Sequence, residues 1–316
     1  MVVLQTCVGA QSTQQLLLQR FNESTGGASW YTTWSGSDMC SWYGVTCSSG
    51  TRDVIELSLA SNNLRGGFPV GILQNLTSLE TVRFGGNHLT GSLSAGLSAL
   101  TSMKSFDISF NSIAGTLPPE LGSSWLALVL FKVNNNQLRG GLPASYSNWT
   151  SLSEFSVWSN YLSGSLPASY SSWSSLQTFA CQDNGLSGTL HTSYGQGTKL
   201  QPFGVSRNQF NGTLPSEFGR WVNLNYFDVS TNSLTGVLPE NYQQWVGLTQ
   251  FIAAWNSISG TLPAVYSAWS QLSVFYMSIN RLSGTLPSVY SNWTLLTTQA
   301  TAVGHHCKPL RARTTA

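Results

Sequence analysis

The sequence predicts an α/β repeat solenoid, in which similar coils stack along one axis. Three regularities predict this fold class. An Asn recurs ten times between Asn62 and Asn280, at intervals of 24 or 25 residues. Apolar residues stand at fixed positions around each Asn, and a Gly follows each Asn by four residues. A period of about 20 to 50 residues indicates units that bury their apolar faces against one another.

Each unit is expected to begin with a short strand. Apolar residues occupy the positions five and three before the Asn, with polar residues between them, which is the period-two pattern of a strand. Phe fills the earlier position in eight units, from Phe106 to Phe275. Stacking places these strands in one parallel sheet, spaced about 4.8 Å apart. The pattern therefore predicts a leucine-rich-repeat horseshoe or arc, with the parallel sheet on its concave face.

The Asn that ends each strand is expected to turn inward. Its amide can bond backbone groups that the turn leaves unpaired, so stacked Asn side chains would form a ladder along the solenoid. The Gly four residues later permits a tight bend. A Pro then follows in eight units and fixes φ at the start of the convex segment.

Two aromatic columns follow on the convex side, one of Tyr or Phe and one of Trp three residues later. This spacing suits a 3-10 or helical turn. The columns would form a ligand strip under one interpretation. Core packing is favoured instead, because the rings stand where convex Leu residues usually do and would bury large areas. The sixth unit departs from the pattern, with His191 in place of Pro and Gly197 in place of Trp.

The ends of the chain are expected to differ from the coils, because the outermost repeats need caps. Residues 1–10 resemble the remnant of a signal peptide. Residues 11–53 are expected to form a helical, disulfide-bonded N-terminal cap, and 54–295 hold the ten repeats. A degenerate repeat and tail occupy 296–316.

Within the cap, Ser12 or Thr13 predicts the start of a helix that continues to Phe21 and stops before Gly26.

Cysteines and sequons favour the secretory pathway, and thus an extracellular or cell-surface location. Cys40 and Cys47 lie close together in a Trp-rich segment and look like a disulfide pair. The chain has five cysteines, so full internal pairing is impossible, and the partners of Cys7 and Cys307 stay open. Cys181 replaces a core Val and is expected to be an inert buried thiol. Candidate N-glycosylation sites start at Asn22, Asn75, Asn148, Asn211 and Asn292.

Composition excludes several classes of partner. Charged residues make up only 8% of the chain and the net charge is +2. The surface is therefore neutral and polar, and the sequence has no basic stripe for nucleic acid. A run of 18 apolar residues does not occur, so no membrane span is expected in this chain.

The motifs resemble two groups of extracellular leucine-rich proteins. The cap Cys-x-Trp-x-Gly-Val-x-Cys, from Cys40 to Cys47, and the repeat Asn-x-Leu-x-Gly-x-Leu-Pro are similar to those of plant extracellular proteins. The unit Ser-Gly-Thr-Leu-Pro-x-x-Tyr-Ser-x-Trp-x-x-Leu, as at 259–272, resembles leucine-rich surface antigens of kinetoplastid protozoa. The resemblance covers about residues 12 to 296. It implies a cell-surface or secreted glycoprotein with a binding or adhesive role.

The sequence contains no motif for catalysis, a cofactor or a metal, so we do not expect an enzyme. The His305-His306-Cys307 tail is expected to be solvated and not metal-binding. Variable positions on the concave face, by contrast, combine aromatics with charges, as binding hot spots do. We hypothesise a ligand site there, although a solvated face without a ligand would also explain polar residues. Its members are Trp158, Asp183, Arg207, Asp228, Trp255 and Tyr276.

The favoured function is recognition or adhesion, with an extracellular protein or carbohydrate bound on the concave face. Two alternatives remain open. An extracellular enzyme inhibitor of the plant leucine-rich type should bind one hydrolase tightly and block it. A structural surface-coat glycoprotein should show no saturable partner.

Overall fold

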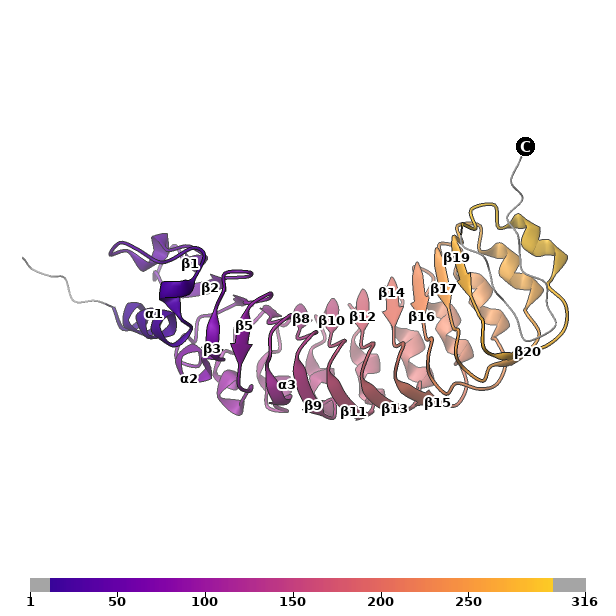
Figure 1. The fold of residues 1–316 in the computed structure, drawn as a ribbon, viewed down its shortest axis with the longest axis horizontal. Coiled ribbons are helices and arrows are strands. Elements are labelled where there is room, and N and C mark those ends of the chain that lie inside the picture. Colours follow the sequence, from indigo (N-terminus) through magenta and orange to yellow (C-terminus); the bar gives the residue numbers. More distant parts are fainter. Residues whose placement is uncertain (1–11, 298–316) are drawn as a thin grey trace, which may run out of the picture.

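The computed structural model describes residues 12–297, which form a leucine-rich-repeat solenoid bent into an arc (Figure 1). One sheet of eleven strands lines the concave side. Its first pair is antiparallel and all later pairs are parallel, as expected for stacked coils. In spatial order the strands are β1 (Val45–Cys47), β2 (Val54–Ser58), β4 (Thr81–Arg83), β6 (Ser105–Asp107), β8 (Leu130–Lys132), β10 (Glu154–Ser156), β12 (Thr178–Ala180), β14 (Pro202–Gly204), β16 (Tyr226–Asp228), β17 (Gln250–Ile252) and β19 (Val274–Tyr276).

The period-two prediction for these strands is confirmed. The register pairs Phe155 with Phe131 on one side and with Phe179 on the other. The same rings stack inside the coil, with centroids 5.8 Å and 5.7 Å apart. Residues on either side of each Phe point to the concave face. The pleat of the strand thus separates core side chains from those on the concave surface.

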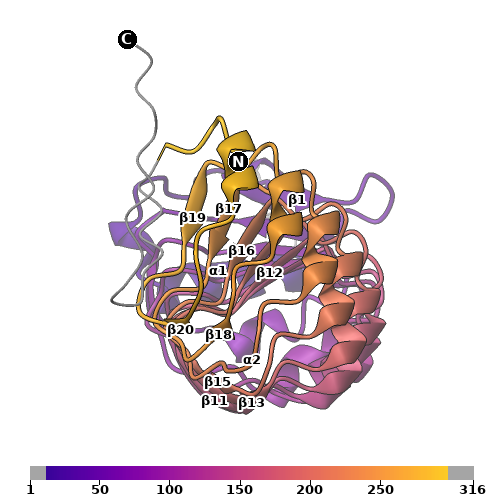
Figure 2. The same cartoon turned by 90° about the vertical axis from the view of Figure 1, so that its right-hand side faces the viewer.

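A second set of parallel strands, which we did not predict, lies on the flank that follows each Asn. Figure 2 shows this flank at the bottom of the coil, beside the concave sheet. The repeated Gly lies inside strands of this flank, where its φ is +78° at Gly164 and +81° at Gly188. The flanking strands are β3 (Arg65–Gly67), β5 (His88–Thr90), β7 (Ala114–Thr116), β9 (Gln137–Gly140), β11 (Tyr161–Ser165), β13 (Gly185–Thr189), β15 (Gln209–Asn211), β18 (Ser259–Gly260) and β20 (Arg281–Leu282).

Short helical turns cover the convex side, as the three-residue aromatic spacing predicts. Most are single 3-10 turns that begin after the Pro of the repeat. The turns are α2 (Val70–Leu73), η3 (Ala95–Ala99), α3 (Leu121–Ser124), η4 (Ala144–Asn148), η5 (Ala168–Ser172), η6 (Thr192–Gln196), η7 (Ser216–Arg220), η8 (Glu240–Gln244), η9 (Ala264–Ala268) and η10 (Ser288–Asn292).

The convex aromatic columns are buried, so the core-packing interpretation is confirmed. Tyr242 and Trp245 stack with centroids 3.9 Å apart, and both are fully buried. The indole Nε1 of Trp245 donates to the carbonyl of Phe218, and the hydroxyl of Tyr242 donates to the carbonyl of Pro215. Both acceptors belong to the preceding coil. Each ring therefore packs its own coil and also bonds the neighbour, which satisfies its polar atom in the core.

The predicted Asn ladder is present. The Nδ2 of Asn160 donates to the carbonyls of Val133 and Val157, at 3.1 Å and 3.0 Å. Its Oδ1 accepts from the backbone N–H of Leu138 at 3.0 Å. The side chain thus joins its own coil to the preceding one, and the same pattern recurs at Asn184.

The N-terminal cap closes the first coil. Helix α1 (Thr13–Ser24) starts at Ser12, whose side chain accepts from the backbone N–H of Gln15, so the predicted cap and helix are confirmed. The helix packs Leu18 and Phe21 into the core. Phe21 and Trp34 stack with centroids 5.8 Å apart, which extends the aromatic core into the cap.

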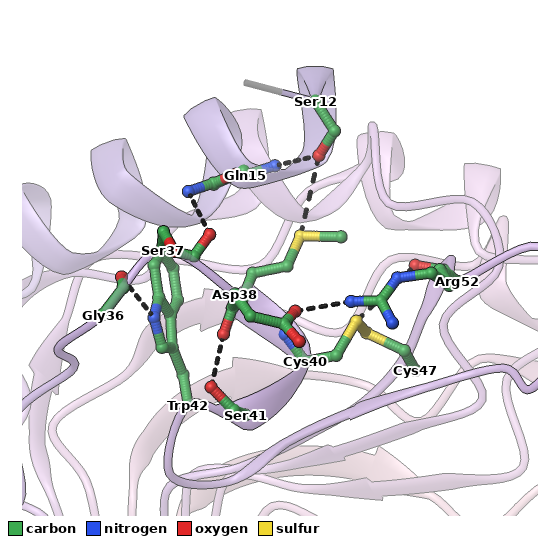
Figure 3. Close-up of polar contacts among 11 residues, drawn as sticks. Ser12, Gln15, Gly36, Ser37, Asp38, Cys40, Ser41, Trp42, Cys47 and Arg52 are labelled. Atoms are coloured by element: carbon green, nitrogen blue, oxygen red, sulfur yellow. Dashed lines mark hydrogen bonds and ion pairs between the residues drawn. A yellow bond between two sulfur atoms is a disulfide. The ribbon is translucent and has the colours of Figure 1, made fainter. Parts of the chain in front are cut away.

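A loop with two 3-10 turns, η1 (Gly27–Ser29) and η2 (Met39–Ser41), follows α1, and a disulfide joins η2 to strand β1. The Cys40–Cys47 bond is present as predicted (Figure 3). Asp38 beside it accepts from the backbone N–H of Cys40 and pairs with Arg52. The backbone hydrogen bond and the Arg52 guanidinium hold the pKa of this carboxyl below its usual value.

Four of the five sequon asparagines are exposed, and Asn22 in helix α1 is half-buried. Within residues 12–297, no helix is both long and apolar enough to cross a membrane. The expectations for residues 1–10, Cys7, the end of the degenerate repeat, the His305-His306 pair and Cys307 lie outside the described residues.

Candidate functional site on the concave face

The residue before each ladder Asn has a left-handed backbone. Its φ is +53° at Asp183, +52° at Arg207 and +59° at Trp255. The backbone N–H of each donates to a carbonyl of the next coil, for example from Asp183 to Ser206 at 3.0 Å. This bond fixes a conformation that non-Gly residues rarely adopt. Most side chains in this column are exposed along the edge of the concave sheet.

Asp183 and Arg207 of the hypothesised site lie together on adjacent coils. Arg207 Nη1 and Asp183 Oδ1 are 3.3 Å apart, and both side chains are exposed. Such a pair adds little to stability because solvent screens it. With Tyr161 and Gln209 it lines an open hollow at the border of the concave sheet and the flank. The pair is therefore free to exchange partners with a ligand.

Trp158 does not line that hollow, and its ring packs on Phe110. The two rings meet edge to face, with centroids 5.8 Å apart. They come from coils two repeats apart, so they bridge the coil between them. Phe110 is 52% exposed, and Trp158 is half-buried beneath it. The two rings form an aromatic surface, which we call the Phe110–Trp158 cluster.

Trp255 and Tyr276 belong to a second apolar surface near the C-terminal end of the arc. Trp255 and its neighbour Ile279 on the next coil are 55% and 52% exposed, and Tyr276 is 38% exposed. Half-buried Ile252 lies on the strand beside Tyr276, its register partner. We call Ile252, Trp255, Tyr276 and Ile279 the C-terminal apolar patch.

Asp228 differs from the other hypothesised residues because it is buried. Its Oδ1 accepts from the backbone N–H and the hydroxyl of Ser230, at 3.0 Å and 2.7 Å. Its Oδ2 accepts from the hydroxyl of Tyr226, and burial together with this carboxylate raises the Tyr226 pKa. Asp107 and Ser109 repeat the arrangement. Asp228 thus closes the turn after its strand, and a ligand cannot reach it directly.

The concave face carries more charge toward the N-terminus. Arg83 and Glu56 form an ion pair of 2.8 Å, and Lys132 and Glu154 one of 3.3 Å. Within each pair the two charges neutralise each other, so this part of the concave face has no strong electrostatic field of one sign. Ion pairs thus occur from the first coils to Asp183 and Arg207, and the C-terminal apolar patch lies beyond them.

Groups suited to metal binding do not gather in the described part of the chain. In residues 12–297, no three His, Cys, Asp or Glu side chains are placed to hold a metal ion. Cys181 is a buried free cysteine, and burial raises its pKa, which makes it a poor nucleophile. The expectation of an inert thiol agrees with this placement.

Sequence reasoning overlooked two features of the site. The first is the left-handed column, because Ile279 and Trp255 are residue types that disfavour positive φ. The second is the burial of Asp228. The Asp-x-Ser spacing that recurs at Asp107 and Asp228 would have indicated a carboxylate bonded to the backbone two residues on.

Comparisons with known proteins agree with the fold. The model named Leucine rich repeat N-terminal domain matches residues 13–48, and the model named Leucine Rich Repeat matches residues 102–124. Receptor-like protein kinase 7 of Arabidopsis thaliana is 32% identical over 114 residues, which is 35% of this chain and 12% of the relative. The chain therefore spans only a small part of that relative's length.

Solved structures of receptors share the fold over most of the chain. The crystal structure of a TDR receptor is 34% identical, with a TM-score of 0.72, and the match covers 76% of this chain and 41% of that one. The receptor kinase HAESA of Arabidopsis, solved with the peptide hormone IDA and the co-receptor SERK1, is 24% identical, with a TM-score of 0.69. That match covers 90% of this chain and 52% of that one. The chain thus resembles plant extracellular leucine-rich proteins.

Proposed function

We propose that this chain is an extracellular recognition protein that binds an extended polypeptide along its concave face. The main observation is the presence of two exposed aromatic surfaces with an ion pair between them. The Phe110–Trp158 cluster and the C-terminal apolar patch would hold apolar side chains of the ligand, and Asp183 with Arg207 would exchange their ion pair for polar groups of the ligand. Such aromatic anchors dominate binding energies.

The spacing of the two surfaces fits a short extended segment. Trp158 and Trp255 stand four coils apart, which is about 19 Å at a strand spacing of about 4.8 Å. An extended chain rises about 3.3 Å per residue, so roughly six residues span this distance. A polypeptide can place apolar side chains on both surfaces at such intervals, with polar groups between them at the ion pair.

The extracellular location is supported by the cap disulfide and the exposed sequons, since disulfides persist mainly in oxidising compartments. A structural neighbour that holds a peptide hormone supports a polypeptide ligand. The Tyr and Trp columns, which resemble those of kinetoplastid surface antigens, fit the same surface-exposed glycoprotein. The proposed role is non-catalytic.

The test selects ligands for the secreted, glycosylated chain from a displayed library of random ten-residue peptides, in parallel with a glycan array. We expect saturable binding of peptides that carry two apolar residues separated by about five positions. The double variant Trp158→Ala, Trp255→Ala should weaken a selected peptide at least about thirtyfold, as expected for hot-spot residues. Its melting temperature should stay nearly unchanged.

Tyr31→Ala is the matched control, because Tyr31 is 77% exposed and lies in the cap loop beside the first coil, outside both proposed anchor surfaces. It should bind the selected peptide as the parent does. Equal affinity of the parent and the double variant would refute the proposed site. Binding to glycans alone would show that the ligand is a carbohydrate and not a polypeptide. Tight inhibition of a secreted hydrolase would favour the enzyme-inhibitor alternative. If neither screen found a saturable ligand, the structural surface-coat alternative would be favoured.

A further inference from the structure

The convex Trp column is interrupted once, at the sixth coil. In the neighbouring coils each indole stacks on the Tyr or Phe three residues earlier, at 3.9 Å for Tyr170 with Trp173 and for Phe218 with Trp221. Each also packs on the Phe of its own strand, at 4.9 Å for Trp173 and Trp221. At the same place the sixth coil has Gly197.

An apolar pocket of about 40 Å³ marks the missing indole. Its walls are the groups that hold the indole in other coils, together with the indoles of the two adjacent coils. A Cβ at Gly197 would lie 3.5 Å from the Tyr194 carbonyl oxygen and 3.9 Å from Trp221 Nε1, which are ordinary contact distances. The backbone therefore leaves the entrance of the slot open. The lining includes Phe179, Tyr194, Leu200, Trp173 and Trp221.

The adjacent coils have not closed over the gap. The centroids of Phe179 and Phe203 are 5.5 Å apart, against 5.8 Å for Phe203 and Phe227, where an indole is present. Tyr194 keeps its place in the column, because its hydroxyl donates to the carbonyls of Leu166 and Pro167. Strand pairing and this anchor hold the coils at the repeat spacing. A slot thus persists there, although its volume of about 40 Å³ is less than that of the indole that fills the equivalent place elsewhere.

One hydrogen-bond acceptor in the slot lacks the partner that its equivalents have. The carbonyl of Tyr146 accepts from the indole of Trp173, and that of Tyr194 from the indole of Trp221, both at 3.0 Å. The corresponding carbonyl of Tyr170 accepts from the backbone N–H of Trp173 at 3.1 Å. Among the hydrogen bonds of residues 12–297, it has no indole donor. The slot therefore offers aromatic walls and one acceptor.

We propose that this pocket binds a small planar aromatic molecule with one N–H donor, of the indole class. The ring stacks on Tyr194, packs on Phe179 and donates to the Tyr170 carbonyl, as the Trp side chains do in the other coils. Ser171 and Gly197 line the pocket and are half-buried, so it communicates with solvent. The unliganded pocket is smaller than an indole, so binding separates its walls. We therefore expect a Kd of about 0.1–1 mM for a ligand of this size.

The test uses the full chain and indole itself, with isothermal titration calorimetry and the thermal midpoint as measurements. We expect one saturable site and a rise in the midpoint with indole concentration. 1-Methylindole and benzothiophene have similar shapes but no N–H donor, so they should bind about five- to tenfold more weakly. The variant Gly197→Trp fills the slot with the residue of the other coils. It should no longer bind indole and should melt at a higher temperature than the parent.

A second variant keeps the test decisive if Gly197→Trp does not fold. Trp245→Gly opens an equivalent slot two coils away, so the stoichiometry for indole should rise from one to two. The concave variant Trp158→Ala, Trp255→Ala should bind indole as the parent does, which separates this site from the proposed peptide site. No saturable binding up to 5 mM indole (about five times the weakest expected Kd) would overturn the proposal. Undiminished binding by a folded Gly197→Trp variant would also overturn it. Equal affinity for 1-methylindole would overturn the role of the Tyr170 carbonyl.

Discussion

Replacing Asn160 by Ala tests whether the Asn ladder holds adjacent coils together. The substitution removes the acceptor of the Leu138 backbone N–H, which has no other partner among the hydrogen bonds of residues 12–297. It also removes one of two donors from each of three carbonyls. Asn136 still bonds Val133, Asn184 still bonds Val157, and the backbone N–H of Asn135 still bonds Trp158. The damage is therefore one orphaned buried N–H and three weakened acceptors.

An unsatisfied buried group costs about 1–3 kcal/mol, and each weakened acceptor costs less. We expect Asn160→Ala to lower the free energy of unfolding by about 2–4 kcal/mol. The matched control is Asn223→Ala, because exposed Asn223 makes a single side-chain bond to the preceding coil, to the Thr198 carbonyl at 2.9 Å. That variant should lose less than about 1 kcal/mol.

The assay is equilibrium unfolding in urea, followed by near-UV circular dichroism of the buried aromatic columns. Hydrogen exchange of the Leu138 amide measures the local effect independently. We expect exchange at Leu138 to accelerate in Asn160→Ala and to stay protected in Asn223→Ala. If both variants lost the same stability and Leu138 stayed protected, the ladder would not bind the coils as described.

Three further predictions concern stability and modification. Burial raises the pKa of convex tyrosines such as Tyr170 and Tyr242, so the folded state favours their neutral form. The free energy of unfolding should stay constant below pH 10 and fall above it, by up to about 1.4 kcal/mol per pH unit for each such Tyr. The measurement is the urea midpoint between pH 9 and 11.5, and a constant midpoint would contradict this prediction. Ile279→Asn should gain about 0.5–1 kcal/mol, because φ is +57° and Asn tolerates the left-handed region better than Ile. Val246→Asn, at a similarly exposed Val whose φ is not positive, should gain nothing in the same unfolding assay. In a glycosylating host, peptide mapping should find glycans on the four exposed sequons and little on Asn22, whose amide packs against Gly27; full occupancy of Asn22 would show that this contact opens before modification.

The repeat made most of the core predictable from sequence. Ten copies of one pattern average out local ambiguity, so the Phe of each strand and the inward Asn were identified by position alone. The same reasoning correctly placed Tyr242 and Trp245 in the core, because their spacing matched a helical turn and their column matched the usual Leu positions.

The flank and the site were less predictable for physical reasons. Segments such as Ser163-Gly164-Ser165 have low strand propensity, so their sequence predicts turns. They pair because the neighbouring coil presents the same backbone at the right distance. Asp228 stands at a concave position, yet its carboxylate turns back to Ser230. Propensity describes one residue at a time, whereas these outcomes depend on what the next coil or the next turn offers.

The left-handed column has a consequence for how this protein can change. Gly86, Ser159, Asp183 and Trp255 differ in size, charge and polarity, yet all have a positive φ at the same place in their coils. Neighbouring coils, and not the side chain itself, dictate that backbone. Substitutions in this column can therefore change the ligand-contacting surface while the backbone fold stays the same. New specificities can accordingly be engineered one coil at a time.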